Sequence, residues 1–168
     1  MLDTARSGMH PSPACPAPCA VLLDVSRRLG AVITTADSRA LAERCLAELP
    51  QRWRHVQGVG YRAEHVAEAL RLPDRALVAA AWLHDIGYGS AVADTGFHPL
   101  DGARFLRGIG AGDRIARLVA HHSCAVYEAR VRGFEQDLLA EFGPEESITY
   151  DALVHLGSHR DYALAASP

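Results

Sequence analysis

A histidine and an aspartate, His84 and Asp85, directly follow the apolar segment 76–83, which reads ALVAAAWL. Such a segment, with no Gly or Pro inside it, is typical of a helix that is buried on nearly all sides. An imidazole and a carboxylate at the end of a buried helix are costly unless a partner binds them. A divalent metal ion is such a partner, because it binds neutral imidazole nitrogen and carboxylate oxygen. The alternative is a polar helix end that is capped by Gly87.

Two further histidines occur in segments that could bring them to the same place. His55 shares one helical face with apolar residues, so we expect it to point toward the core; these residues are Val59, Ala63, Val66 and Leu70. A histidine that is simply packed in the core is the alternative role. His98 directly precedes Pro99, which suits the first turn of a helix, and from there its side chain could reach a neighbour or cap the helix.

The pair His121-His122 closes a helix whose apolar residues are Ile115, Leu118 and Val119. This stripe points His122 inward, whereas His121 lies over Leu118 and could tilt toward the same cavity. Because neighbours on a helix are about 100° apart, one of the two histidines could be structural. Both therefore stay candidates for metal binding.

The order of these residues resembles the HD-domain superfamily of metal-dependent phosphohydrolases. Its pattern is a histidine, then a His-Asp pair, then a later aspartate, all on helices. The resemblance covers roughly residues 50–130, and its most specific part is the segment 81–87, AWLHDIG. His98 and the pair His121-His122 are similar to the extra histidines of HD subgroups that hold two metals.

The resemblance implies an all-α, HD-like helical bundle that hydrolyses a phosphate ester or anhydride, with a nucleotide as the expected substrate class. It implies one or two divalent ions, for which Mn, Mg, Fe, Zn, Co and Ni are all candidates. Asp85, which could bridge two ions, is the candidate catalytic residue. The implied metal ligands are His55, His84, Asp85, His98, His121 and His122.

The last aspartate of the superfamily pattern has no clear match in this chain. By resemblance it should lie near Gly157, but Asp151 comes about two helical turns too early and Asp161 about one turn too late. We therefore expect neither to complete the metal shell; an altered C-terminus would produce this pattern. The gap favours a degenerate HD module that binds metal or nucleotide without turnover. A di-iron HD-type oxygenase is a third hypothesis, because a His-rich site with carboxylates suits iron.

All 17 basic residues are arginines, since the sequence has no lysine. This excludes a Schiff-base lysine and a Walker-type phosphate loop. Arginine can donate two hydrogen bonds to one phosphate. Of the three arginines that flank His55, namely Arg52, Arg54 and Arg62, we expect Arg54 and Arg62 to bind the substrate phosphate. A solvated helix face is the alternative for this group.

Composition sets the class of protein. The chain has 168 residues, 49% of them hydrophobic, and a net charge of -3. The size predicts one domain, and the charge argues against nucleic-acid binding. The resemblance implies a small phosphorylated molecule as the partner. The four cysteines form neither a zinc-binding nor a disulfide pattern. The sequence also shows no signal peptide and no apolar run near the ~20 residues of a membrane span. We therefore expect a cytoplasmic protein.

The elements that must position these residues follow from apolar periodicity and breakers. Residues 1–19, with Pro11, Pro13, Pro16 and Pro18, predict a disordered tail, and residues 20–168 a helical domain whose metal-site core spans about 50–130. Only the segment 20–25 could form a strand. The first predicted helix runs from Asp37 or Ser38 to Leu49, and the second spans 52–71. The third is capped by Asp74 and carries His84, the fourth runs from Pro99 to Gly108 or Gly110, and the fifth is capped by Asp113. The last two span 128–142 and 145–156.

Overall fold

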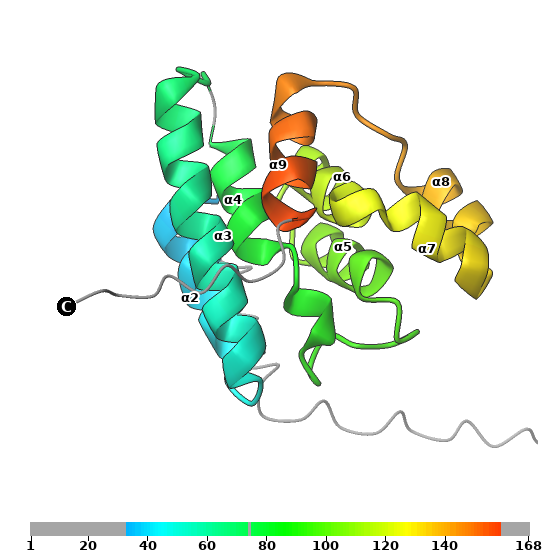
Figure 1. Ribbon diagram of the computed structural model, residues 1–168. Helices are drawn as coiled ribbons and strands as arrows, with labels where there is room; N and C mark the ends of the chain where they lie inside the picture. Colours follow the sequence, from blue (N-terminus) through cyan, green and yellow to red (C-terminus); the bar gives the residue numbers. More distant parts are fainter. Residues whose placement is uncertain (1–32, 74, 159–168) are drawn as a thin grey trace, which may run out of the picture.

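The computed structural model describes residues 33–73 and 75–158, and every regular element in them is a helix (Figure 1). This confirms the all-α prediction. The tail predicted for residues 1–19, the segment 20–25, the Asp74 cap and Asp161 all lie outside the described residues. The elements are α2 (Thr35–Cys45), α3 (Pro50–Ala69), α4 (Ala76–Leu83), η1 (Ile86–Tyr88), α5 (His98–Gly108), α6 (Asp113–His121), η2 (His122–Cys124), α7 (Ala125–Arg132), α8 (Glu135–Glu141) and α9 (Ile148–Ser158).

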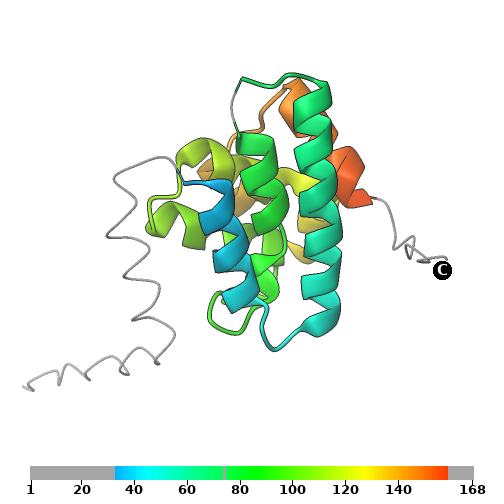
Figure 2. The ribbon, with the colours of Figure 1, turned by 90° about the vertical axis from the view of Figure 1, so that its left-hand side faces the viewer.

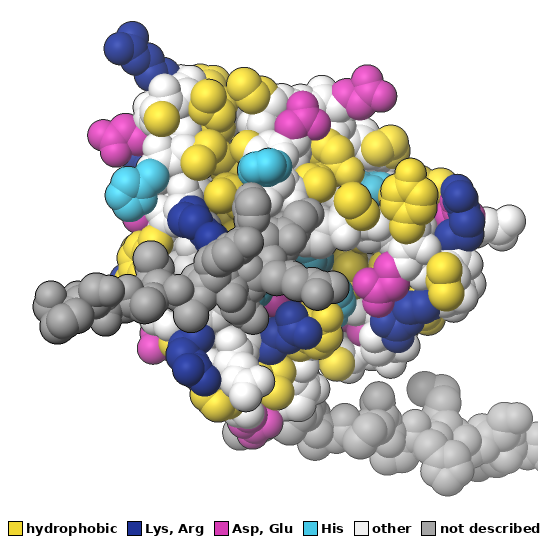
Figure 3. Space-filling view, in the orientation of Figure 1, with side chains coloured by type: hydrophobic (Ala, Val, Ile, Leu, Met, Phe, Trp, Pro, Cys, Tyr) yellow, Lys and Arg dark blue, Asp and Glu magenta, His cyan; other side chains and the backbone are white. Residues whose placement is uncertain are grey.

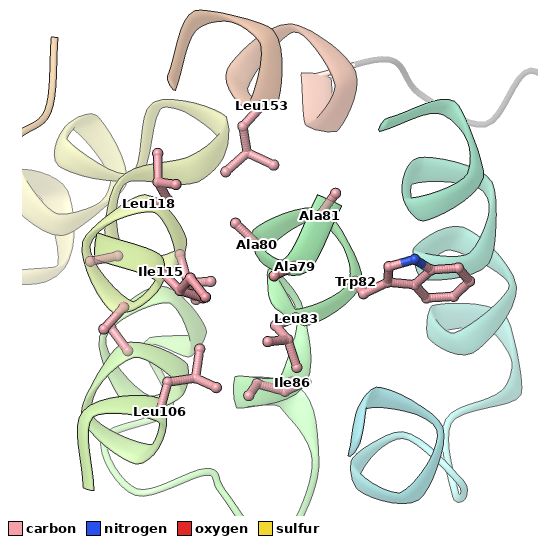
Figure 4. Packing of buried hydrophobic residues seen from close by; sticks show 14 of the residues in the cluster. Ala79, Ala80, Ala81, Trp82, Leu83, Ile86, Leu106, Ile115, Leu118 and Leu153 are labelled. Carbon is pink, nitrogen blue, oxygen red and sulfur yellow. The ribbon is translucent and has the colours of Figure 1, made fainter. Parts of the chain in front are cut away.

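Helix α4 forms the centre of the bundle. Every residue from Leu77 to Leu83 is buried, and because all of these side chains are apolar, no face of the helix needs solvent. Helices α2 and α3 pack against α4, which lies between them in the view of Figure 2, and α6 also packs against α4. Leu153 of α9 approaches the same helix from above in Figure 4. The buried helix expected from the apolar segment is therefore confirmed.

Trp82 sets the close approach of α4 to α3. Its side chain is fully buried, and its indole nitrogen donates a hydrogen bond to Glu64 Oε1 at 3.2 Å. Gly60 makes room for the ring, because a Cβ atom there would lie only 2.5 Å from Trp82 Cε2. The short distance between these helices brings His55, on α3, close to the end of α4.

The buried face of α3 is rotated slightly from the predicted one. It consists of Val56, Val59, Gly60, Ala63 and Ala67, while Leu70 is exposed. His55 therefore lies at the edge of this face and is only partly buried. At this edge, the His55 imidazole lies near the core and is still partly exposed to solvent.

Helix α2 begins earlier than predicted because a capping box forms. The hydroxyl of Thr34 accepts a hydrogen bond from the Asp37 amide at 3.1 Å, and the Asp37 carboxylate accepts one from the Thr34 amide at 3.2 Å. The helix thus begins at Thr35, capped by Thr34, rather than at Asp37 or Ser38. Asp37 lies inside the first turn, where a negative charge also suits the helix dipole.

Glycines account for two other differences from the predicted helices. The segment expected as one helix, 128–142, is split into α7 and α8 at Gly133, whose φ of 80° lies in the left-handed region that favours glycine. Gly112, with a φ of 104°, takes the cap position of α6 that we expected for Asp113.

Apolar side chains are scattered over the upper part of the face in Figure 3. Tyr127 and Val131 on α7 are among the most exposed of the large apolar residues.

Within 33–73 and 75–158, no helix has the length and apolar character needed to cross a membrane.

Candidate metal centre

Five of the six predicted metal ligands come together where several helices end or begin. His55 projects from α3, His84 ends α4, Asp85 follows it, His98 begins α5, and His122 follows α6. They form two groups, one of His55, His84 and Asp85 and one of Asp85, His98 and His122. Within each group, one possible ligand atom per residue lies within 4.8 Å of the others. Asp85 belongs to both groups.

The carboxylate of Asp85 is at the centre of this cluster. Its Oδ1 atom lies 3.6 Å from His84 Nε2, 3.5 Å from His98 Nε2 and 3.7 Å from His122 Nε2. Two atoms bound to one tetrahedral ion at about 2.1 Å each are separated by roughly 3.4 Å. The observed separations are therefore close to those of ligands that share a metal ion.

Backbone carbonyls fix the protonation of two of the imidazoles. Nδ1 of His84 lies 2.7 Å from Ala81 O, and Nδ1 of His122 lies 2.6 Å from Val119 O. Because a carbonyl oxygen can only accept, both Nδ1 atoms carry the proton and donate it. The Nε2 atom of each ring then offers a lone pair to the cluster, as metal-binding histidines commonly do.

The Nε2 atom of His84 is buried and has no hydrogen-bond partner among the described residues. An unpaired buried acceptor costs about 1–3 kcal/mol, so native proteins rarely keep one without a reason. A metal ion bound to this lone pair would remove the cost. The residues present therefore fit a metal ion, and this atom is the best single indication of one.

Burial favours the neutral, metal-binding form of two imidazoles in the cluster. It lowers the pKa of His84 to about 4 and the pKa of His98 to about 3. Burial acts to raise the pKa of Asp85, but the neighbouring His84 and His122 outweigh it and hold this pKa well below its usual range. At neutral pH the Asp85 carboxylate therefore lies beside two neutral imidazoles, His84 and His98, which is the state that metal binding requires.

His121, the sixth predicted ligand, is not brought to the cluster. Its Nε2 atom lies 2.7 Å from Phe142 O, and the ring belongs to neither group. Helix α6 ends at His121, and His122 takes an extended backbone with φ -60° and ψ 155°. The two side chains therefore leave the helix end in different directions. Only His122 of the pair stays a candidate ligand, and His121 connects α6 to the segment before α9.

The turn after His122 is strained. Ser123 and Cys124 have φ values of 50° and 60°, in the left-handed region that residues other than glycine rarely adopt. Strain of this kind is often retained near functional sites because the surrounding structure needs the side chain that it directs. Here it accompanies the change of direction that places His122 next to Asp85.

Arg52 is the arginine near His55 whose contact with the cluster the structure shows. Arg52 reaches it, with one guanidinium nitrogen 3.3 Å from Asp85 Oδ2 and a side chain that is 46% exposed. Arg54 and Arg62 instead donate to carbonyls of their own helix, Pro50 O and Gly58 O. The sequence contained a signal for Arg52, because it precedes His55 by three residues and so shares the same face of the helix. Arg54 is turned away from His55 by about 100° around the helix axis.

Tyr88 is a neighbour of the cluster that the sequence analysis missed. Its ring stacks on His98, with centroids 3.9 Å apart and planes at 17°, and the Arg52 guanidinium carbon lies 4.1 Å from its centroid. Burial raises the pKa of its hydroxyl. Its position three residues after Asp85, one turn on in η1, was the available signal.

Asp101 and Gly87 position His98 at the start of α5. The buried carboxylate of Asp101 accepts hydrogen bonds from the amides of Asp94, Thr95 and Gly96, each at 3.0 Å, and so holds the loop before His98. A Cβ atom at Gly87 would lie 2.0 Å from His98 O. Glycine at this position therefore allows η1, which follows Asp85, to touch the first turn of α5.

Helix α9 contributes no carboxylate to the two groups within the described residues. Asp151 is exposed and belongs to neither group. The buried residues of α9 include Leu153, and Gly157 is four positions later in the same helix, hence on the same face. Because α9 packs against α3, α4 and η2, this face is directed at the elements that carry His55, His84 and His122.

A comparison with protein-family models identifies an HD domain over residues 52–155. No curated protein and no solved structure matches the chain significantly.

Proposed function

The chain belongs to the HD-domain family, and on this premise we propose that it is a metal-dependent phosphohydrolase acting on a phosphate ester or anhydride, with nucleotides as the substrate class. One observation carries the proposal. Two potential metal-binding groups share the Asp85 carboxylate, and the Nε2 atom of His84, which has no hydrogen-bond partner in the described part of the chain, lies 3.6 Å from it.

The ligands for the metal follow from these groups. His55, His84 and Asp85 would hold one ion, and Asp85, His98 and His122 a second. When bound, such ions polarise a phosphoryl oxygen and lower the pKa of a coordinated water molecule toward neutrality. Iron, manganese, zinc and the other divalent ions considered above all accept this mixture of nitrogen and oxygen ligands.

The side chains prepare the site for an anionic substrate. Asp85 stays ionised, its Oδ1 atom lies near histidines of both groups, and Arg52 contacts its Oδ2 atom. The half-exposed guanidinium of Arg52 still has donors that can reach toward solvent. An arginine at this position can donate hydrogen bonds to a phosphate and hold it beside the carboxylate.

Two alternatives remain, each with an observation in its favour. The exposed position of Asp151 favours a degenerate HD module that binds metal or nucleotide without turnover. The histidine-rich composition of the two groups also suits a di-iron oxygenase.

A metal analysis combined with a phosphate-release assay separates the three functions. The full chain, stripped with a chelator and reloaded with Mn²⁺, Fe²⁺, Co²⁺ or Zn²⁺, is assayed on nucleoside mono-, di- and triphosphates. We expect phosphate release that requires metal and is lost in Asp85→Asn but retained in Asp151→Asn, a matched change of an exposed aspartate. Metal binding without any phosphate release supports the binding module. Bound iron with oxygen consumption, and no phosphate release, supports the oxygenase.

The proposed partner is a small phosphorylated molecule, since a net charge of -3 gives no basic footprint for nucleic acid. We keep the cytoplasm as the proposed compartment on the basis of cysteine usage. Cys45 and Cys124 are both free thiols in the structure.

A further inference from the structure

Tyr88 lies in the middle of a three-layer stack beside the metal centre. One face of its ring covers the His98 imidazole, with centroids 3.9 Å apart, and the Arg52 guanidinium carbon lies 4.1 Å from its centroid. The planes of Tyr88 and His98 are nearly parallel, at 17°. Stacking of this kind restricts both the position and the plane of an imidazole.

His98 differs from the other two buried histidines of the cluster in how its ring is held. The Nδ1 atoms of His84 and His122 each donate to a backbone carbonyl. For the His98 ring, the only hydrogen-bond contact within residues 33–73 and 75–158 is between its Nε2 atom and His122 Nε2. The second hydrogen bond that usually orients a metal-binding histidine is therefore not supplied to His98 Nδ1 by a described residue. The contact with Tyr88 is the interaction that can replace it.

The stack is also connected to the shared carboxylate. Arg52 lies over Tyr88 and contacts Asp85 Oδ2 at 3.3 Å, while His98 Nε2 lies 3.5 Å from Asp85 Oδ1. The four side chains thus form a closed ring of contacts that joins α3, the end of α4, η1 and α5. Because Tyr88 is the member without a charge or a possible ligand role in either group, its contribution is geometric.

We propose that Tyr88 is a positioning residue of the second group: stacked between Arg52 and His98, its ring fixes the imidazole plane so that His98 Nε2 faces Asp85 and His122. The proposal rests on the metal-binding function proposed above and extends it to a residue outside the ligand set. A ring that is already oriented loses less freedom when it binds an ion, so the second ion should bind more weakly without Tyr88.

The test compares the full chain with Tyr88→Leu, which removes the ring, and Tyr88→Phe, which keeps it. Tyr127→Leu, at a tyrosine on α7 that is 71% exposed, is the matched control. Mn²⁺ is titrated calorimetrically into each chelator-stripped protein. We expect Tyr88→Leu to weaken the binding of Mn²⁺ at the second group by about tenfold, in the range seen when groups that orient metal ligands are removed. Binding at the first group should weaken by less than about twofold. Tyr88→Phe and Tyr127→Leu should match the parent.

A second measurement detects the stacking of Tyr88 on His98 in the metal-free protein. Aromatic ring currents should shift the His98 ring protons upfield in the NMR spectrum of the stripped parent and of Tyr88→Phe, and the shift should disappear in Tyr88→Leu. Circular dichroism confirms folding, and Tyr88→Gln replaces the leucine variant if that variant unfolds.

The outcomes separate this proposal from the proposed function. A parent chain that binds no Mn²⁺ contradicts the function and this proposal with it. Two binding events that are unchanged in Tyr88→Leu contradict this proposal alone. A loss in Tyr88→Phe equal to that in Tyr88→Leu also overturns it, because the hydroxyl rather than the stacked ring would then be responsible.

Discussion

The Nε2 atoms of His98 and His122 lie 3.2 Å apart, although the two residues are separated by 24 positions in the sequence. The Nδ1 atom of His122 donates to Val119 O, so its Nε2 atom carries a lone pair. Two ring nitrogens at this distance attract each other only when a proton or a cation lies between them. The pair, with Asp85 Oδ1 within 3.7 Å of both, defines the second group.

Arg52 should affect substrate binding, and Arg54 should not. We expect Arg52→Gln to raise the KM for a phosphate substrate by about tenfold, in keeping with the ~1.5–3 kcal/mol of a hydrogen bond to a charged group. Bound metal should be retained. Arg54→Gln, at an exposed arginine that donates to Pro50 O on the same helix, is the control. Steady-state kinetics decide: equal KM values in the parent and Arg52→Gln would remove Arg52 from the substrate site.

Gly87 should tolerate no side chain. In Gly87→Ala the new Cβ atom would lie 2.0 Å from His98 O and 2.9 Å from Gly102 N, both backbone atoms. We expect a loss of about 3 kcal/mol in the free energy of unfolding, at the upper end of overpacking costs, together with weaker metal binding. Gly108→Ala is the control, since a Cβ atom there meets nothing within 4 Å. Chemical denaturation that shows no difference between the two variants would contradict the close contact of η1 with α5.

The metal-free protein should lose stability as the pH falls below about 6.5. Burial lowers the pKa of His84 to about 4 and that of His98 to about 3, from the 6.5 that is usual for histidine. Between these values the unfolded chain binds more protons than the folded one, so stability is fully present above pH 6.5 and decreases toward pH 4. The expected slope is roughly 1 kcal/mol per pH unit for each imidazole.

Denaturation of chelator-treated protein at pH 7, 6 and 5 measures this slope. His65→Asn, which changes an exposed histidine, should leave it unchanged, whereas His98→Asn should reduce it. A free energy of unfolding that stays constant from pH 7 to pH 5 would show that these imidazoles are not held neutral by burial.

A carboxylate at position 157 should strengthen the metal centre. Gly157 follows the buried Leu153 by four residues in α9, on the face that packs toward the cluster. We expect Gly157→Asp to raise the metal affinity by about tenfold, or about 1.4 kcal/mol, with faster phosphate release. Asp151→Ala, which removes an exposed aspartate, should change neither. If Asp151→Ala instead abolished metal binding while Gly157→Asp had no effect, Asp151 would already be serving as the missing ligand.

The part of the fold that could be predicted depends on strong local signals. The segment 76–83 is apolar at every position, and its many alanines, with no Gly or Pro, favour a buried helix. Both α4 and the placement of His84 and Asp85 at its end could therefore be predicted. The approach of His55 also followed, because its helix had a recognisable apolar face. The break at Gly133 was missed because a single glycine does not reveal whether it will interrupt a helix or lie within it.

The details of the site depend on how the helices end, and periodicity carries little information about that. His121 and His122 differ in role because α6 stops between them and the next residues adopt positive φ, which their side chains do not predict. Tyr88 stacks on His98 only because Gly87 lets η1 approach α5, a contact between segments ten residues apart. Such relationships follow from tertiary packing rather than from local sequence.

The number of metal ions per chain in Asp85→Asn tests the central claim most directly, because Asp85 is the only residue common to both groups among the described residues. Elemental analysis after equilibration with Mn²⁺ and removal of the free ion gives this number for the parent, for Asp85→Asn and for the exposed-site control Asp151→Asn. The shared carboxylate predicts two ions in the parent and the control, and none in Asp85→Asn, with the helical content measured by circular dichroism retained. An Asp85→Asn protein that keeps both ions would contradict a metal centre organised around Asp85.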